Sequence, residues 1–164
     1  MLGAMRRYYF FALLITCILL GFSFYLQLQG VIPCTLCLLQ RFALALLGII
    51  FLIGTLCKFQ RVSHHVVLAS STLLVTTIGL LLSGRQTWLQ HFPPQQSSEC
   101  AASLQYMLQV LPLHEVALKV LQGSVECTET IWSFLGLSLA EWSLLCFLGF
   151  LLFGLYQLYR AVTA

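Results

Sequence analysis

The chain has 164 residues, of which 60% are hydrophobic and only 8% are charged. Because a soluble domain normally carries about a quarter charged residues, most of this surface cannot face water, and the length fits one domain, residues 1–164. The net charge is +3 without any run of Lys or Arg, so the composition excludes a nucleic-acid-binding surface.

The first apolar stretch covers residues 8–28 and follows Arg6 and Arg7. It is longer than the apolar region of a secretory signal, and it lacks a small-x-small cleavage pattern near its end. We therefore interpret it as a retained membrane span.

Three further stretches have the ~20 mostly apolar residues that a membrane helix needs. They cover residues 36–57, 66–83 and 142–159. The sequence therefore predicts an all-α fold, an integral membrane four-helix bundle. The predicted connections are residues 29–35, residues 58–65 and a long loop, residues 84–141.

The basic residues predict the orientation of these spans, because cytoplasmic segments of membrane proteins carry an excess of Lys and Arg. One side of the predicted bundle holds Arg6, Arg7, Lys58, Arg61 and Arg160, and the other holds Arg41, Arg85 and Lys119. We therefore predict that both termini and residues 58–65 are cytoplasmic and that the other two loops face outward. All five acidic residues fall in the long loop, which supports its exposure to water.

The long loop contains two short amphipathic segments, residues 103–111 and 113–121. In each segment, apolar residues share one face at helical spacing. The first face holds Leu104, Met107, Leu108 and Leu111, and the second holds Val116, Val120 and Leu121. Two arrangements fit this pattern: helices that lie in the membrane interface with the apolar face down, or a small loop subdomain packed on itself.

The seven cysteines divide into two groups. Cys34, Cys37, Cys100 and Cys127 lie in or beside the predicted outer loops, whereas Cys17, Cys57 and Cys146 lie inside or at the ends of spans. Disulfides persist on the oxidising side of a membrane, so the outer four cysteines predict two pairs. We interpret the other three as small apolar packing residues.

The first outer pair is a C-x-x-C motif, Cys34 to Cys37, directly after Pro33 at the start of a predicted helix. Unpaired backbone N–H groups and the helix dipole favour a thiolate there, and a thiolate is the species that attacks disulfides. A zinc site is one alternative, but it would need a second ligand pair at matching spacing. A structural disulfide is another, but so short a loop adds little stability.

The second outer pair, Cys100 and Cys127, lies in the long loop. A disulfide between them would close a loop of roughly 28 residues and could stabilise it by ~3–4 kcal/mol, so a purely structural bridge is an alternative to a redox pair. Glu99 and Glu126 each precede one of these cysteines, and a neighbouring carboxylate disfavours a thiolate. Two dithiols tuned in opposite directions suit an electron relay.

Arg41 lies one helical turn after Cys37 on the same helix face. A guanidinium at the edge of the hydrocarbon is costly unless it is paired or reaches the interface. It therefore either snorkels or holds charge near Cys37, where it favours a thiolate or donates to an anionic oxygen of a bound quinone. Arg85 and Gln86, near the outer end of the third span, offer further donors, and Trp88 alternatively belongs to an interfacial aromatic belt.

Several segments resemble the disulfide bond formation protein B family, DsbB, of bacterial inner-membrane thiol:quinone oxidoreductases. Residues 33–41, P-C-T-L-C-L-L-Q-R, resemble its P-C-x-L-C-x-x-x-R motif. Residues 85–93, R-Q-T-W-L-Q-H-F-P, resemble the segment after its third span. Residues 111–113 and 126–137 resemble its second loop and the approach to its fourth span, and the outer cysteines follow the family's order and spacing.

The resemblance implies a bundle in the inner membrane whose cysteine-bearing loops face the periplasm. Cys100–Cys127 would accept electrons from a soluble thioredoxin-like oxidase, DsbA, with Cys100 forming the mixed disulfide. Electrons would then pass to Cys34–Cys37 through a transient link between Cys34 and Cys127. Cys37 would face the acceptor, ubiquinone or menaquinone, with assistance from Arg41.

One position departs from the family pattern. Some members carry a His near the quinone where this chain has Gln86, and a Gln side chain donates a hydrogen bond but carries no charge at neutral pH.

The alternative function is a four-span transporter or structural membrane protein with disulfide-stapled loops. It predicts charged residues along a path through the spans. Beyond Arg41, however, the spans contain essentially only Ser, Thr and Gln as polar residues.

Overall fold

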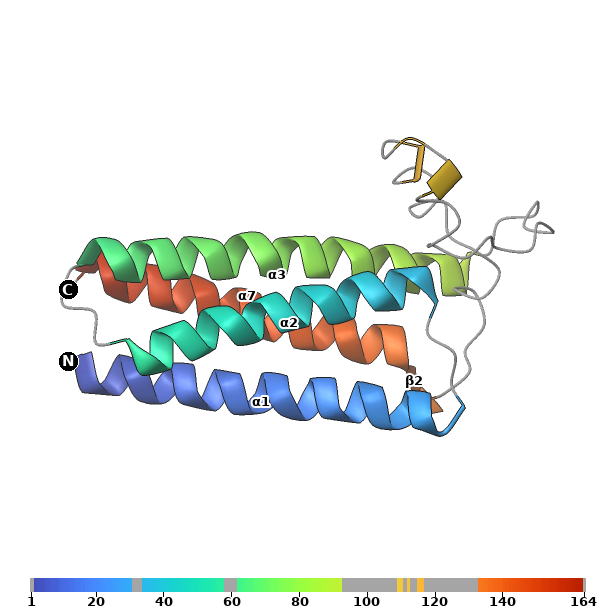
Figure 1. The fold of residues 1–164 in the computed structure, drawn as a ribbon, viewed down its shortest axis with the longest axis horizontal. Coiled ribbons are helices and arrows are strands. Elements are labelled where there is room, and N and C mark those ends of the chain that lie inside the picture. Colours follow the sequence, from blue (N-terminus) through green and yellow to red (C-terminus); the bar gives the residue numbers. More distant parts are fainter. Residues whose placement is uncertain are drawn as a thin grey trace.

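The computed structural model describes most of the chain outside the long loop. The described residues are 2–30, 34–57, 62–92, 109–110, 112, 115–116 and 133–163. Four long helices lie side by side in it (Figure 1). They are α1 (Leu2–Leu28), α2 (Thr35–Leu56), α3 (Val62–His91) and α7 (Leu139–Thr163). The predicted all-α four-helix bundle is therefore confirmed.

The helices run alternately up and down. The start of α1, the end of α2, the start of α3 and the end of α7 lie at one end of the bundle, which we call the terminal end (Figure 1). The start of α2, with Cys34 and Cys37, lies at the opposite end, which we call the cysteine end. A short hairpin of β1 (Ser133–Phe134) and β2 (Leu137–Ser138) precedes α7 there. Its two-residue turn has positive φ at Leu135 (55°) and Gly136 (80°), as tight hairpins require.

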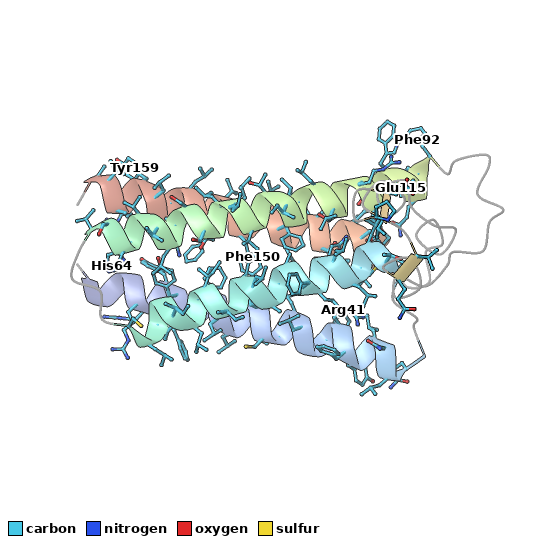
Figure 2. The ribbon with its side chains drawn as sticks, turned by 45° about the horizontal axis from the view of Figure 1, so that its top comes forward. Arg41, His64, Phe92, Glu115, Phe150 and Tyr159 are labelled. Carbon is cyan, nitrogen blue, oxygen red and sulfur yellow. The ribbon has the colours of Figure 1, made fainter. Side chains whose placement is uncertain are left out.

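Each of the four helices is long and apolar enough to cross a membrane, judged by length and composition. Large apolar side chains also cover the outside of the bundle, and Figure 2 shows side chains projecting from the helices along their length. Examples that are at least 60% exposed are Phe11, Ile18, Phe42, Leu74, Leu81 and Leu152. A continuous apolar exterior suits lipid rather than water, so the chain is a multi-pass membrane protein.

The core between the helices is rich in aromatic side chains. Tyr9, Phe51 and Phe147 are at most 1% exposed. Small residues make room for these rings: a Cβ on Gly54 would lie 2.7 Å from the Tyr9 ring, and one on Gly79 would overlap the Phe147 ring. Close packing over small residues is a common way for membrane helices to associate, and here it joins α1 to α2 near the terminal end and α3 to α7 midway along the bundle.

Three helices are longer than the spans predicted from the sequence. Helix α1 begins at Leu2 rather than near residue 8. Helix α3 continues through residues 84–91, which we assigned to the long loop, and α7 begins at Leu139 rather than near residue 142. Apolar composition ends near Ser83, but Arg and Gln are good helix formers, so the helix continues as far as His91, shortly before Pro93 and Pro94.

The predicted amphipathic segments, residues 103–111 and 113–121, lie largely outside the described residues. Residues 109–110 and 115–116 are helical where they are described. Val116 is buried and belongs to an apolar cluster with Cys34, Leu36 and Leu89. One residue of the predicted apolar face therefore packs against the cysteine end of the bundle.

Candidate functional site

The start of α2 brings the two cysteines of the C-x-x-C motif into contact. Cys34 is the N-cap residue, with an extended backbone, and its sulfur accepts the backbone N–H of Cys37 at 3.4 Å. This bond satisfies one of the unpaired N–H groups of the first turn. Both residues are in the thiol form, and their sulfurs lie 3.0 Å apart. Since a disulfide needs about 2.05 Å, a small rotation is enough to close the pair.

The two sulfurs differ in their surroundings. Cys34 is only 4% exposed and packs with Leu36, Leu89 and Val116. Cys37 is partly exposed, and its neighbour Leu38 on the same helix is 41% exposed. Cys37 is therefore the member of the pair that a molecule outside the bundle reaches more easily.

Gln86, one of the predicted site residues, lies against Cys37. It projects from α3, is 4% exposed, and its Nε2 lies 3.1 Å from the Cys37 sulfur. Its Oε1 is 3.6 Å from the same sulfur. The carboxamide therefore donates to the sulfur of a Cys37 thiolate and can accept from a Cys37 thiol.

Two further polar residues extend this contact, and sequence reasoning missed both. Gln40 Nε2 donates to Gln86 Oε1 at 2.8 Å, and Ser143 Oγ on α7 donates to Gln40 Oε1 at 2.9 Å. The available signal was Gln40 itself, because a carboxamide inside a membrane span is costly unless it is paired.

Arg41, also a predicted site residue, extends toward α1 (Figure 2). Its guanidinium donates to Gln27 Oε1 at 2.5 Å and to the backbone oxygen of Ser23 at 3.0 Å. It also lies 5.6 Å from the centre of the Phe24 ring. The side chain is thus paired with α1, one helical turn from Cys37, and its role toward a quinone stays a prediction.

The remaining predicted residues divide between described and undescribed parts of the chain. Arg85 is partly buried on α3, beside Gln86. Trp88 is 57% exposed and stacks near Phe92, with ring centres 4.6 Å apart. Cys100 and Cys127 lie outside the described residues, so their pairing stays a prediction.

The three cysteines assigned to packing are not alike. Cys146 is partly buried, but Cys17 and Cys57 are exposed on the outside of the bundle. The packing interpretation was therefore wrong for those two. Their sulfurs lie on helix faces that point away from the core, a distinction that composition alone does not make.

Comparison with known proteins decides the family. A family model described as "Disulfide bond formation protein DsbB" matches residues 5–157. The chain belongs to the DsbB family. The proteins named disulfide bond formation protein B from Stutzerimonas stutzeri and Hahella chejuensis are 36% and 40% identical to it, over 97% and 88% of this chain and 98% and 88% of theirs. The protein of that name from an Azoarcus strain is 40% identical, over 94% of this chain and 93% of its own length.

Membership of the DsbB family identifies the chain as a membrane disulfide oxidase. The paired thiols at the start of α2 are suited to that chemistry, because a dithiol that closes to a disulfide gives up two electrons and two protons. The family assignment also sets aside the transporter alternative.

Proposed function

We propose that this chain is a dithiol:quinone oxidoreductase of the bacterial inner membrane. It would reoxidise a DsbA-like thioredoxin-fold partner in the periplasm and pass the electrons to ubiquinone or menaquinone. The observation that carries the proposal is the Cys34–Cys37 contact at one end of a membrane bundle, with an amide donor 3.1 Å from the Cys37 sulfur.

The first exchange would take place in the long loop. A thiolate of the partner attacks Cys100 in the Cys100–Cys127 disulfide, and Cys127 leaves as a thiolate. The second thiolate of the partner then attacks the partner's other sulfur, which is bonded to Cys100 in the mixed disulfide, and Cys100 is released as a thiolate. The partner is oxidised by two electrons, and the Cys100–Cys127 pair is reduced by two.

The second exchange would reach the membrane. The Cys127 thiolate attacks Cys34 in the Cys34–Cys37 disulfide, and Cys37 leaves as a thiolate. Cys100 then attacks Cys127, which restores that disulfide and frees Cys34. The leaving sulfur is the one beside Gln86, so a donor is already in place where negative charge develops.

The described residues fit an apolar ring-shaped acceptor. Cys37 is partly exposed, and Leu38 and Phe42 on α2 are exposed apolar side chains that lipid can contact. Re-forming the Cys34–Cys37 disulfide releases two electrons and two protons, which reduce one quinone to a quinol. The DsbA couple is already strongly oxidising, at about −120 mV, so an acceptor of higher potential is needed.

Two arginines would assist at this end. Arg41 is held by α1, and Arg85 precedes Gln86 on α3. Positive charge near Cys37 favours its thiolate and any anionic form of the acceptor. The contact of Gln86 with a quinone belongs to the same proposal.

The test uses purified full-length protein in detergent, with a reduced DsbA-like partner and a soluble quinone. Replacement of Cys37 by Ser should abolish quinone reduction, because no disulfide can form with Cys34. Cys57→Ser is the matched control and should retain activity, since that cysteine is exposed at the far end of α2 from the pair. Full quinone reduction by the Cys37→Ser protein would refute the proposal.

A further inference from the structure

A directed chain of hydrogen bonds crosses three helices and ends on the Cys37 sulfur. Ser143 on α7 donates to Gln40 on α2 at 2.9 Å, and Gln40 donates to Gln86 on α3 at 2.8 Å. Gln86 then donates to Cys37 at 3.1 Å. Gln40 is 6% exposed and Gln86 is 4% exposed, so bulk water does not supply alternative partners to these amides.

The direction of each bond is set by the one before it. A carboxamide has a donor end and an acceptor end, so a partner at one end determines what the other end presents. Gln40 Nε2 donates to Gln86 Oε1 and so orients the carboxamide, whose nitrogen lies nearer the sulfur (3.1 Å) than its oxygen does (3.6 Å). The Ser143 proton holds Gln40 in the same sense, although it is shared with the backbone oxygen of Ala140 at 2.8 Å.

The reversed arrangement would be unfavourable for a thiolate. If the Gln86 carboxamide turned over, its oxygen would take the place of the nitrogen 3.1 Å from the Cys37 sulfur. Two acceptors would then face each other in a region of low dielectric, where unpaired charge is costly. The orientation of Gln86 therefore controls how readily Cys37 exists as an anion.

We propose that Gln40 is a positioning residue, which together with Ser143 holds the Gln86 amide nitrogen on the Cys37 sulfur and so stabilises the Cys37 thiolate. This inference rests on the proposed function, in which Cys37 leaves as a thiolate. It adds a role for Gln40 and Ser143, which would act on the sulfur through Gln86. The alternative is a purely structural role, in which these residues only join the helices, as polar side chains do in many membrane bundles.

The test is the pH profile of Cys37 alkylation in the fully reduced, full-length protein, with Cys37 resolved by mass spectrometry. Gln40→Met keeps the side-chain length but removes both polar ends. We expect its alkylation midpoint to rise by about one pH unit, which is about tenfold slower alkylation at neutral pH, because a hydrogen bond to a charged group is lost. Ser143→Ala is a milder substitution, and it replaces Gln40→Met if that variant does not fold. It should move the alkylation midpoint in the same direction by less.

A double-mutant cycle separates positioning from helix joining. Gln86→Met should move the midpoint as Gln40→Met does, and the double variant should move it no further, because Gln40 acts through Gln86. Gln157→Met is the control: Gln157 is 2% exposed on α7, about 20 Å along the helix from Ser143 at 1.5 Å per residue, and should leave the midpoint unchanged.

Three outcomes would overturn the inference. The first is an unchanged alkylation midpoint in Gln40→Met or, if that variant does not fold, in Ser143→Ala. The others are an unchanged midpoint in Gln86→Met, and midpoint shifts of the two Gln variants that add fully in the double variant. The proposed function fails by a different result, namely quinone reduction that persists in Cys37→Ser. The alkylation profile needs neither quinone nor partner, so the two failures are distinguishable.

Discussion

At the scale of single residues, several polar and charged side chains near the cysteine end have identified partners on a neighbouring helix. Arg41 makes two hydrogen bonds to α1 and lies over the Phe24 ring. Such pairing offsets the cost of a guanidinium at the edge of the hydrocarbon. Arg41 therefore has a structural task, joining α1 to α2, in addition to the acceptor-binding role that we propose for it.

These two tasks predict different results for two substitutions. Arg41→Met removes the charge and both hydrogen bonds, whereas Gln27→Ala removes one hydrogen bond and leaves the charge. We expect Arg41→Met to lower the free energy of unfolding by about 1 kcal/mol, and Gln27→Ala by less, since interhelical hydrogen bonds in membranes are individually modest. Unfolding would be measured by SDS titration of protein in detergent micelles.

The kinetic comparison decides whether Arg41 also serves the acceptor. Arg41→Met should raise the KM for quinone at least several-fold, while Gln27→Ala should leave it near the wild-type value. An equal change of KM in both variants would show that Arg41 acts only by joining the helices.

At the scale of the helices, the sequence predicted which helices are present better than it predicted where they begin and end. Apolar runs located all four helices, because the length needed to cross lipid is fixed. They did not locate the end of α3 at His91 or the start of α7 at Leu139, since these turns are set by local hydrogen bonds and helix formers rather than by hydropathy.

The C-x-x-C motif predicted the site residues Cys34 and Cys37. The Gln40–Gln86 and Gln40–Ser143 hydrogen bonds, however, join residues 46 and 103 positions apart, and no local sequence pattern indicates such pairings.

The start of α7 rests on a capping box between Ser138 and Glu141. The Ser138 N–H donates to Glu141 Oε2 at 2.6 Å, and the Glu141 N–H donates to Ser138 Oγ at 3.3 Å. Ser138 Oγ also donates to Gln90 Oε1 at 2.7 Å, and Glu141 lies 3.7 Å from His91. The same two residues therefore cap α7 and tie it to the end of α3.

Ser138→Ala removes the cap and the link to α3 together. We expect it to lower the free energy of unfolding by about 1–2 kcal/mol, the upper part of the range for a lost N-cap. Ser138→Thr is the control, because its hydroxyl can still accept the Glu141 N–H and donate to Gln90 Oε1, and it should lose less. Identical SDS unfolding curves for Ser138→Ala and the wild type would contradict a stabilising role for this cap.

At the scale of the whole molecule, the two ends of the bundle differ in chemistry. The cysteine end holds the thiol pair and the hydrogen-bonded Gln40 and Gln86, and the terminal end holds Arg6, Arg7 and Arg160 (Figure 1). Basic residues beside spans favour the cytoplasmic side. With 22 residues, α2 is about 33 Å long at 1.5 Å per residue, which is enough to cross a hydrocarbon core of about 30 Å. A helix that crosses lipid therefore places Cys37, in its first turn, and Cys57, directly after its last residue, on opposite sides.

Accessibility of single-cysteine variants to a membrane-impermeant maleimide tests this orientation. A variant that keeps only Cys37 should be labelled in right-side-out spheroplasts, because its sulfur is partly exposed at the end that we predict to face outward. One that keeps only Cys57, which is exposed at the far end of α2, should be labelled in inverted vesicles instead. Cys17, exposed to lipid midway along α1, should be labelled in neither until detergent is added. Labelling of Cys37 only in inverted vesicles would place the thiol pair in the reducing cytosol, where disulfides do not persist, and the electron path proposed for this chain would then run from the wrong side of the membrane.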